Sequence, residues 1–212
     1  MEPKQKEYLE KIYESNERMI SLVSDLLDAS RIEEGRFGYD FKENDFHQML
    51  AVVLKSFEDA AQKRAIRLEL KTTLEPLPKF TFDSQRIGYA LSNIIDNAIR
   101  YTNPGGRVTV ELLRKNAFLE VGVSDTGVGI PEAEKSRVFT KFFRGGNVIK
   151  LQTEGSGLGL FIAKNIIKRH GGDVGFVSEI GKGSRFYFTL PLKREYIPAE
   201  EARPLAAFPE AV

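Results

Sequence analysis

The sequence predicts an α/β (α+β) fold, a two-layer sandwich of a mixed sheet and helices with one long N-terminal helix. Three observations support this prediction. Alternating apolar segments follow one another in pairs joined by short turns, which is typical of hairpins. Amphipathic helical segments are grouped with these strands without strict alternation, so one helical layer is expected to cover one sheet face. An apolar seam of helical period fills the first 35 residues.

The long helix is predicted over residues 1–35, because apolar or neutral residues recur there at alternating intervals of three and four, as in a coiled coil. The seam comprises Leu9, Ile12, Asn16, Met19, Val23 and Leu26. Gly35 offers a stop for the helix. Such a seam requires a partner helix, so we interpret the segment as part of a helical bundle. A lone helix that packs on its own domain is the alternative.

The first elements after this helix are a strand, a helix and a second strand. Alternating aromatic residues over 37–41 predict a short strand. Asn44 or Asp45 could cap a helix that runs to about Arg64. Alternation over 66–70 predicts the second strand.

A second amphipathic helix is predicted to start at Asp83 and to end at the turn 103–106, which contains proline and two glycines. Its apolar side is formed by Ile87, Leu91, Ile94, Ile95 and Ala98. Strands are expected over 108–113 and 118–123, and Pro131 suits the first turn of a short helix.

The stretch 140–156 lacks periodicity and is predicted to be a long loop, a kind of segment that is usually functional or disordered. A helix over 157–169 and strands over 173–178 and 184–190 then complete the domain. This domain is expected to span residues 36–192. The remaining residues, 193–212, combine prolines with alanine and glutamate and are predicted to form a poorly ordered tail.

The composition excludes several classes of protein. The 31 basic and 30 acidic residues nearly balance, which disfavours binding to nucleic acid. The chain has no cysteine, so it has no disulfide and no thiolate metal site. It contains neither an 18-residue apolar run nor a signal-peptide core, which predicts a soluble, cytoplasmic protein. A helical pattern is already under way at Met1, so a longer parent protein, with or without a membrane anchor, is expected.

An amide-bearing helix is the first of three motifs that point to a nucleotide triphosphate. Asn93, Asn97 and Arg100 are spaced by four and three residues, so they share one helix face opposite Ile94 and Ile95. Asparagine oxygens are acceptable ligands for Mg²⁺, and an arginine can offset phosphate charge. An ordinary solvated helix face is the alternative for these residues.

Glycines form the second motif, because 15 of the 18 lie between Gly105 and Gly183. The two known phosphate-loop signatures are absent: no Gly-x4-Gly-Lys-Ser/Thr occurs, and the segment 155–160 lacks the last glycine of the dinucleotide fingerprint. This segment nevertheless opens a predicted helix, whose free amide groups and positive dipole end could hold phosphates. A glycine turn that only caps the helix is the alternative.

The third motif is an aspartate that follows a strand and precedes two glycines, in the order Asp125, Gly127, Gly129. A carboxylate there could accept a hydrogen bond from the exocyclic amine of adenine, a donor that guanine lacks at that position. A loop aspartate that caps its own turn is the alternative.

Taken in order, these motifs resemble those of the sensor histidine kinases of two-component systems and, more broadly, the ATP-binding superfamily of DNA gyrase, Hsp90 and MutL. The resemblance covers about residues 8–192 and implies the Bergerat-type ATP-binding fold. The similar segments are the end of the second dimerisation helix at 24–35, the asparagine box at 93–101, the glycine boxes at 125–130 and 155–160, the phenylalanine box at 139–144 and the closing turn at 181–186.

The resemblance implies a role for each residue of these segments. Asp125 would contact adenine, in a site lined by Tyr101, Ile130 and the first glycine box with Gly127 and Gly129. Asn93 and Asn97 would position Mg²⁺, and Arg100 and Arg144 would meet the phosphates of ATP. Thr189 would support the adenine contact through water. The triphosphate would be wrapped by Gly155, Ser156, Gly157, Leu158 and Gly159, with residues 140–156 as a lid.

Two departures from the family pattern concern phosphate contacts. Arg100 stands where a lysine is common, and Thr140 and Lys141 stand where glutamate and arginine are common.

The phosphoacceptor is the main missing feature, because no segment resembles the family's phosphorylated histidine. His47 and His170 lie in other contexts and are expected to be structural or surface residues. The resemblance therefore implies a kinase that delivers the γ-phosphate of ATP to a histidine outside this chain. The implied partners are a phosphoacceptor helix and a response regulator, and homodimerisation through residues 1–35 is left open.

Other functions of the same superfamily remain as alternatives at this stage. An ATPase of the gyrase or Hsp90 kind would use a glutamate where this chain has Asn93, and an amide cannot serve as a general base. A serine kinase of the anti-sigma type would share the pocket but would not be expected to carry the bundle helix. A nucleotide sensor or scaffold without catalysis is the third alternative.

Overall fold

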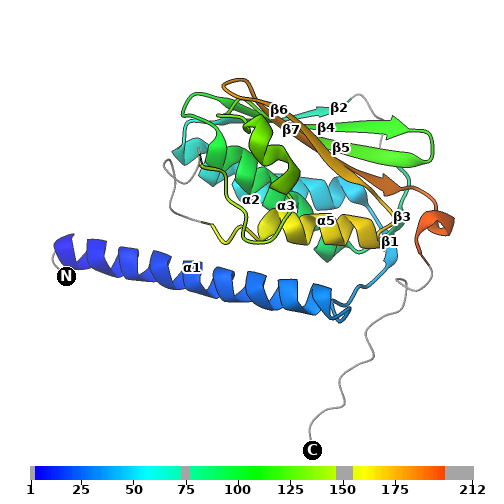
Figure 1. Cartoon of the computed structure of the whole chain (residues 1–212), viewed down its shortest axis with the longest axis horizontal. Coiled ribbons are helices and arrows are strands. Elements are labelled where there is room, and N and C mark those ends of the chain that lie inside the picture. The colour runs from blue at the N-terminus through cyan, green and yellow to red at the C-terminus, as the bar shows by residue number, and fades with distance from the viewer. Residues whose placement is uncertain (1–2, 73–76, 147–154, 199–212) are drawn as a thin grey trace, which may run out of the picture.

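The computed structural model describes residues 3–72, 77–146 and 155–198 (Figure 1). The helices are α1 Pro3–Glu33, α2 Phe46–Lys63, α3 Ser84–Tyr101 and α5 Gly159–Arg169, with short 3-10 helices at Glu132–Arg137 and Arg194–Tyr196. The strands are β1 Lys42–Asn44, β2 Arg67–Thr72, β3 Phe80–Phe82, β4 Arg107–Lys115, β5 Phe118–Asp125, β6 Val174–Glu179 and β7 Gly183–Pro191.

Five strands form a mixed sheet in the order β2-β4-β5-β7-β6. The β2–β4 pair is parallel and the other neighbours are antiparallel. Helices α2, α3 and α5 lie together on one face of this sheet (Figure 1). The predicted two-layer sandwich with a mixed sheet is therefore confirmed.

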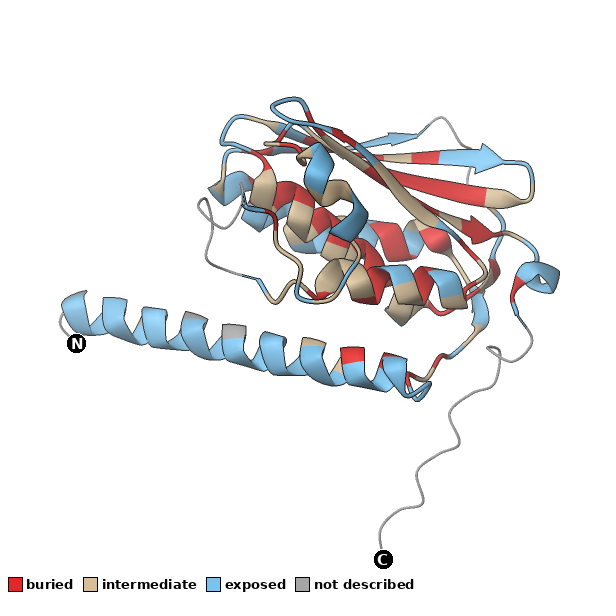
Figure 2. Ribbon diagram, viewed as in Figure 1, coloured by how far each residue is buried: buried red, intermediate tan, exposed pale blue. Residues whose placement is uncertain are grey.

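The core lies between the sheet and the three helices (Figure 2). Helix α3 buries the predicted apolar side, and Ile87, Leu91 and Ile95 are fully buried. Strand β4 contributes Val108 and Val110 to the same core. Because α3 is packed along this whole side, its opposite face is held in a fixed direction.

Two aspartates start the helices as predicted. The Asp45 side chain accepts a hydrogen bond from the Gln48 N–H at 3.0 Å, and the Asp83 side chain accepts one from the Arg86 N–H at 2.9 Å. Each bond satisfies an amide group that the first helical turn would otherwise leave without a partner.

Helix α1 runs beside the sandwich and exposes most of its surface (Figure 2). The described apolar seam positions, Leu9, Ile12, Met19, Val23 and Leu26, are all more than half exposed. The buried residues among those described in this helix, Ala29 and Ile32, lie in its C-terminal part, and Gly35 follows its end with a positive φ of 67°. Among the described residues, no helix is long and apolar enough to cross a membrane.

The strand predicted over 37–41 is wrong. These residues are extended without ladder partners, and the strand β1 follows them and pairs with β3, which the sequence did not predict. The aromatic alternation reflects burial: Phe37 stacks edge-on against Tyr39 with ring centroids 5.5 Å apart, and the Arg86 guanidinium lies 3.9 Å from the Phe37 ring centroid. A buried extended segment gives the same periodicity as a strand.

The C-terminal boundary also differs from the prediction. Residues 193–198 are ordered, with the 3-10 helix Arg194–Tyr196 and a buried Ile197 side chain. The structured chain therefore continues beyond residue 192, where the sequence predicted a poorly ordered tail. Residues 199–212 of the predicted tail and residues 147–154 of the predicted lid lie outside the described residues.

Candidate functional site

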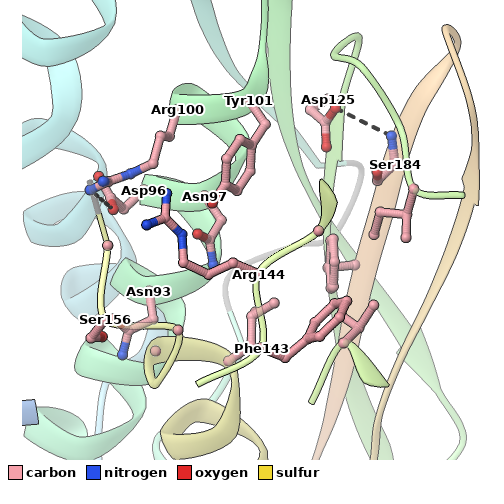
Figure 3. Close-up of a pocket in the computed structure, with 18 of the residues that line it drawn as sticks. Asn93, Asp96, Asn97, Arg100, Tyr101, Asp125, Phe143, Arg144, Ser156 and Ser184 are labelled. Atoms are coloured by element: carbon pink, nitrogen blue, oxygen red, sulfur yellow. Dashed lines mark hydrogen bonds and ion pairs between the residues drawn. The ribbon is translucent and has the colours of Figure 1, made fainter. Parts of the chain in front are cut away.

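A cavity of about 500 Å³ opens between α3, the end of β5, the second glycine segment and α1. It brings together all but three of the residues selected from the sequence (Figure 3). These are Asn93, Asn97, Arg100, Tyr101, Asp125, Gly129, Ile130, Arg144, Gly155, Ser156, Gly157 and Gly159. The three that do not line it are Gly127, Leu158 and Thr189.

Helix α3 supplies one wall of the cavity with its polar face. The side chains of Asn93, Asn97 and Arg100 follow one another along this wall (Figure 3). The Arg100 guanidinium forms an ion pair of 2.7 Å with Asp96, one turn earlier. The Asn93 Nδ2 atom is buried and has no hydrogen-bond partner within the described part of the chain. A buried amide without a partner is costly, so this wall is suited to a polar ligand.

Asp125 occupies the opposite end of the cavity, where β5 ends. Its Oδ1 atom accepts hydrogen bonds from the backbone N–H groups of Gly127 at 2.8 Å and Ser184 at 3.2 Å (Figure 3). Burial raises the pKa of this carboxyl to about 6, although the two hydrogen bonds favour the ionised form. Because both bonds go to Oδ1, the Oδ2 atom is available to a ligand donor.

The first glycine segment packs closely against the backbone of Tyr101 and of Glu179. A Cβ atom on Gly127 would overlap with the carbonyl oxygen of Tyr101, and one on Gly129 would overlap with the carbonyl oxygen of Glu179. Gly129 also has a positive φ of 68°. These glycines are therefore required by close backbone packing, which fixes the position of Asp125 beside them.

The second glycine segment enters helix α5. A Cβ atom on Gly159 would lie 2.9 Å from the Asn93 Oδ1 atom, so the helix start is held against the amide wall. Among the described residues, no side chain caps the first turn of α5, although the Ser156 hydroxyl oxygen accepts a hydrogen bond of 3.1 Å from the N–H of the preceding residue, Leu158. The first amide groups of α5 and the positive end of its dipole are thus available to an anion. Leu158 is buried, which explains why its side chain is absent from the cavity.

Thr189 was assigned wrongly. Its Oγ1 atom accepts a hydrogen bond from the Asp173 N–H at 2.9 Å, away from the cavity. Side chains alternate along a strand, so Thr189 shares a face of β7 with Arg185 and Tyr187, whereas Ser184 and Phe186 line the cavity. Ser184 is the residue of this strand that contacts Asp125.

Asp25 of α1 is a cavity residue that the sequence did not indicate. Its Oδ1 atom accepts a hydrogen bond from the Tyr89 hydroxyl at 2.6 Å, and its Oδ2 atom accepts one from the Ser156 hydroxyl at 2.7 Å. It therefore links α1 both to α3 and to the second glycine segment. No motif marks this position, because the contact joins residues 131 positions apart.

His170 is a structural residue, as expected. It is buried, its Nε2 atom accepts a hydrogen bond from the Asp83 N–H at 3.0 Å, and its Nδ1 atom lies 2.8 Å from the Ile166 carbonyl oxygen. Burial lowers the pKa of this imidazole to about 4. His47 is half-buried near the start of α2.

The charged side chains around the cavity are not suited to bind a polyanion without an additional cation. Its described lining contains four carboxylates, Asp25, Asp96, Asp125 and Glu134, and two guanidiniums, Arg100 and Arg144. Acidic side chains thus outnumber basic ones. A highly charged anion would need a further cation here, because two arginines cannot neutralise both it and the carboxylates.

Comparison with known families identifies two regions of the chain. Residues 82–194 match the family described as histidine kinase-, DNA gyrase B-, and HSP90-like ATPase. Residues 1–35 match the His Kinase A (phospho-acceptor) domain.

Two curated relatives are histidine kinases. The circadian input-output histidine kinase CikA of Synechococcus elongatus is 33% identical over 202 residues, which cover 95% of this chain and 27% of that protein. The sensor histidine kinase WalK of Bacillus subtilis is 33% identical over 182 residues, which cover 84% of this chain and 29% of that protein. The chain thus spans little more than a quarter of each of these relatives.

Solved structures of histidine kinases share the fold. Full-length ShkA in complex with AMPPNP has a TM-score of 0.76 at 27% identity, covering 91% of this chain and 40% of that chain. Histidine kinase ThkA in complex with the response regulator TrrA has a TM-score of 0.72 at 26% identity, covering 92% and 54%. The chain therefore belongs to the family of histidine kinase-, DNA gyrase B- and HSP90-like ATPases, as the ATP-binding catalytic portion of a sensor histidine kinase preceded by a helix of the phosphoacceptor domain.

Proposed function

We propose that this chain binds Mg-ATP in the cavity and delivers its γ-phosphate to a histidine on a helix outside the chain. The supporting observation is the convergence of three distant motifs on one cavity of about 500 Å³, a volume suited to a ligand of this size. The amide wall of α3 lies on one side and the buried carboxylate of Asp125 lies at the other end.

Adenine is assigned to the end of the cavity at Asp125. The Oδ2 atom would accept a hydrogen bond from the exocyclic amine, while Gly127 and Ser184 hold the carboxylate through Oδ1. Tyr101 and Ile130 line the same cavity and would contact the base. Guanine would place a carbonyl oxygen against the carboxylate, so adenine is preferred.

The phosphates are assigned to the end formed by α3 and the start of α5. The second glycine segment and the first amide groups of α5 would bind phosphate oxygens, apart from the Leu158 N–H, which donates to the Ser156 hydroxyl oxygen. Arg100 and Arg144 line this part of the cavity and would pair with the same anion (Figure 3). Arg100 would exchange part of its ion pair with Asp96 for phosphate contacts.

Mg²⁺ fits the residues at the phosphate end. The described chain contains no cluster of three histidine, aspartate or glutamate side chains that could hold a metal ion alone. The ion would be held by the side-chain oxygens of Asn93 and Asn97 together with water and phosphate oxygens, a ligand set that Mg²⁺ accepts. When bound, it supplies the positive charge that the acidic cavity lacks and offsets the charge of the transferring phosphoryl group.

The remaining groups are assigned to positioning the nucleotide. Asn93 stands at the point where a hydrolase would need a carboxylate, and an amide cannot accept the proton. The γ-phosphate would therefore stay on the nucleotide until a histidine on a helix outside the chain accepts it. The exposed seam of α1 is proposed to pair with that helix, within one chain or in a homodimer, and a response regulator would receive the phosphoryl group afterwards.

Nucleotide binding is the first test. We expect Mg-ATP to raise the thermal unfolding temperature of the chain, because a ligand that binds only the folded state stabilises it. Asp125→Ala and Asn97→Ala should abolish this shift, whereas Thr189→Ala, on the other face of β7, should retain it. The proposal fails if millimolar Mg-ATP protects neither the wild-type chain nor Thr189→Ala.

Phosphoryl transfer is the second test. With labelled Mg-ATP alone, the chain should remain unlabelled, because the Nε2 atom of buried His170 is occupied and His47 is partly buried. Adding a chain that carries the first dimerisation helix with its histidine should give an acid-labile label on that helix. Labelling of His47 or His170 would contradict the assignment.

A further inference from the structure

Asp25 places a carboxylate of α1 at the phosphate end of the cavity. It lines the cavity together with Ser21 and Leu22 of the same helix. Its two oxygen atoms are taken by the hydroxyl groups of Tyr89 and Ser156. The carboxylate thus closes the cavity on the side of α1 and holds the second glycine segment to that helix.

This carboxylate conflicts with a polyphosphate. Ser156 belongs to the segment that, in the proposed function, wraps the phosphates of ATP, and its hydroxyl lies 2.7 Å from Asp25 Oδ2. A phosphate near Ser156 would compete for the same hydroxyl hydrogen and would lie beside a second negative charge. The Asp25 carboxylate and a phosphate beside the same hydroxyl would repel each other strongly, because water is partly excluded from the cavity.

Helix α1 also packs against α5, and its other described contacts with the domain lie near its C-terminal end. An ion pair joins Glu33 to Lys141, a partly exposed pair that contributes little. Ala29 and Ile32 are the buried apolar residues of the described part of the helix. Gly35, with its positive φ, lies directly after α1. The Ala29 and Ile32 side chains belong to the hydrophobic core, whereas no described residue of α1 before Ala29 does, so this earlier part of the helix can leave the domain while Ala29 and Ile32 stay packed.

We propose that the phosphates of the nucleotide and the docked helix α1 compete through Asp25, so that binding of ATP releases α1 from the catalytic domain. This inference rests on the proposed Mg-ATP site. The coupling is reciprocal: a docked α1 weakens ATP binding by the same factor by which ATP weakens docking. In this role Asp25 is a positioning residue, which holds the nucleotide-free catalytic domain against α1.

A series of nucleotides tests the charge conflict. Asp25→Asn keeps the size of the side chain and one acceptor oxygen, replaces the other oxygen by an amide donor to which a hydroxyl oxygen can bond, and removes the charge. We expect it to raise the affinity for Mg-ATP by about tenfold, within the usual range for coupling between two sites. The gain should shrink through ADP and AMP and vanish for adenosine, as measured by calorimetry at constant Mg²⁺.

Two control variants separate charge from general effects. Glu17→Gln removes a carboxylate from an exposed part of α1 and should leave all four affinities unchanged. Tyr89→Phe removes a hydrogen bond to Asp25 but keeps the charge, so it should not show the gain that grows with phosphate number in Asp25→Asn. An equal gain for adenosine and ATP in Asp25→Asn would overturn the inference.

The position of α1 provides a readout independent of affinity. The chain has no cysteine, so Ser15→Cys on α1 and Val177→Cys on β6, both exposed, can carry a pair of spin labels. We expect Mg-ATP, but not adenosine, to add longer distances to the label distribution, and Asp25→Asn to suppress this change. Unchanged distances in a wild-type chain saturated with Mg-ATP would refute the inference. Failure of the wild type to bind any nucleotide would instead refute the proposed function.

Discussion

The backbone N–H of Asp83 donates a hydrogen bond of 3.0 Å to the Nε2 atom of His170, and so joins the start of α3 to the end of α5. The Asp83 side chain meanwhile accepts bonds from the backbone N–H groups of Arg86 at 2.9 Å and Asp40 at 2.7 Å. His170 must be neutral at Nε2 to accept this bond. One residue pair thus fixes both helices that frame the cavity.

This bond makes folding stability depend on pH. Burial lowers the pKa of His170 from 6.5 to about 4. Between these two pH values, His170 is protonated in the unfolded chain and neutral in the folded chain. The stabilisation is complete above pH 6.5 and is lost as the pH falls towards 4, by about 3 kcal/mol in total. Urea unfolding of wild type and His170→Gln at pH 7 and pH 5 should show the smaller pH dependence in the variant. Equal dependence in both chains would contradict this account.

Asp125 should make nucleotide binding depend on pH. Its pKa of about 6 means that the acceptor form is depleted as the pH falls below that value, so ATP affinity should fall with it. Asp125→Asn should weaken ATP binding roughly 10- to 100-fold, as expected for a hydrogen bond to a charged group, and should lose the preference for ATP over GTP. Comparing both chains at each pH cancels the protonation of the nucleotide itself. A parallel pH dependence in Asp125→Asn would exclude this role.

Asp125 also lowers stability as the pH rises. Since its folded pKa of about 6 exceeds the ordinary value of 3.8, ionisation between these limits favours the unfolded chain. In the same pH range, its effect on folding stability is opposite to that of His170. The contribution of one group is therefore obtained from the difference in stability between the wild type and the variant of that group.

Gly183 should be intolerant of any side chain. Its φ is 97°, and a Cβ atom there would overlap with the carbonyl oxygen of Asp125. Gly183→Ala should therefore destabilise the fold by about 3 kcal/mol, through backbone strain and the displacement of a neighbouring strand end. Gly181→Ala is the matched control, because Gly181 also has a positive φ but open space around it, and should cost roughly 1 kcal/mol. Similar losses in both variants would show that strain alone matters.

Asn93 should be needed for metal-dependent binding. Asn93→Ala is expected to reduce the affinity for Mg-ATP at least tenfold, by removal of a metal ligand worth more than about 1.4 kcal/mol, but to leave adenosine binding nearly unchanged. Calorimetry with and without Mg²⁺ provides the comparison. The wild type should hydrolyse ATP negligibly, and turnover that Asn93→Ala abolishes would support the ATPase alternative instead.

Local chemistry explains which features the sequence predicted well. Asp45 and Asp83 start their helices through bonds within three residues, so the signal is contained in a short segment. The grouping of Asn93, Asn97 and Arg100 on one face follows from helix geometry alone. These features need no knowledge of the tertiary fold.

Features that depend on distant packing could not be predicted in this way. The contact between Asp25 and Ser156 exists only because α1 lies against the domain. Thr189 was assigned by resemblance to a strand residue of the family, whereas the alternation along β7 directs Ser184 to the cavity. The segment 37–41 alternates like a strand because it is buried, although it has no ladder partner.

The parallel pairing of β2 with β4 has a mechanical consequence. Parallel neighbours require a crossover connection, and here that connection contains α3. The helix is preceded by β3, which pairs with β1, and followed by β4 of the five-stranded sheet. The buried apolar side of α3 fixes one wall of the cavity, and the release proposed for α1 would confine ligand-driven movement to the side from which a substrate helix would approach.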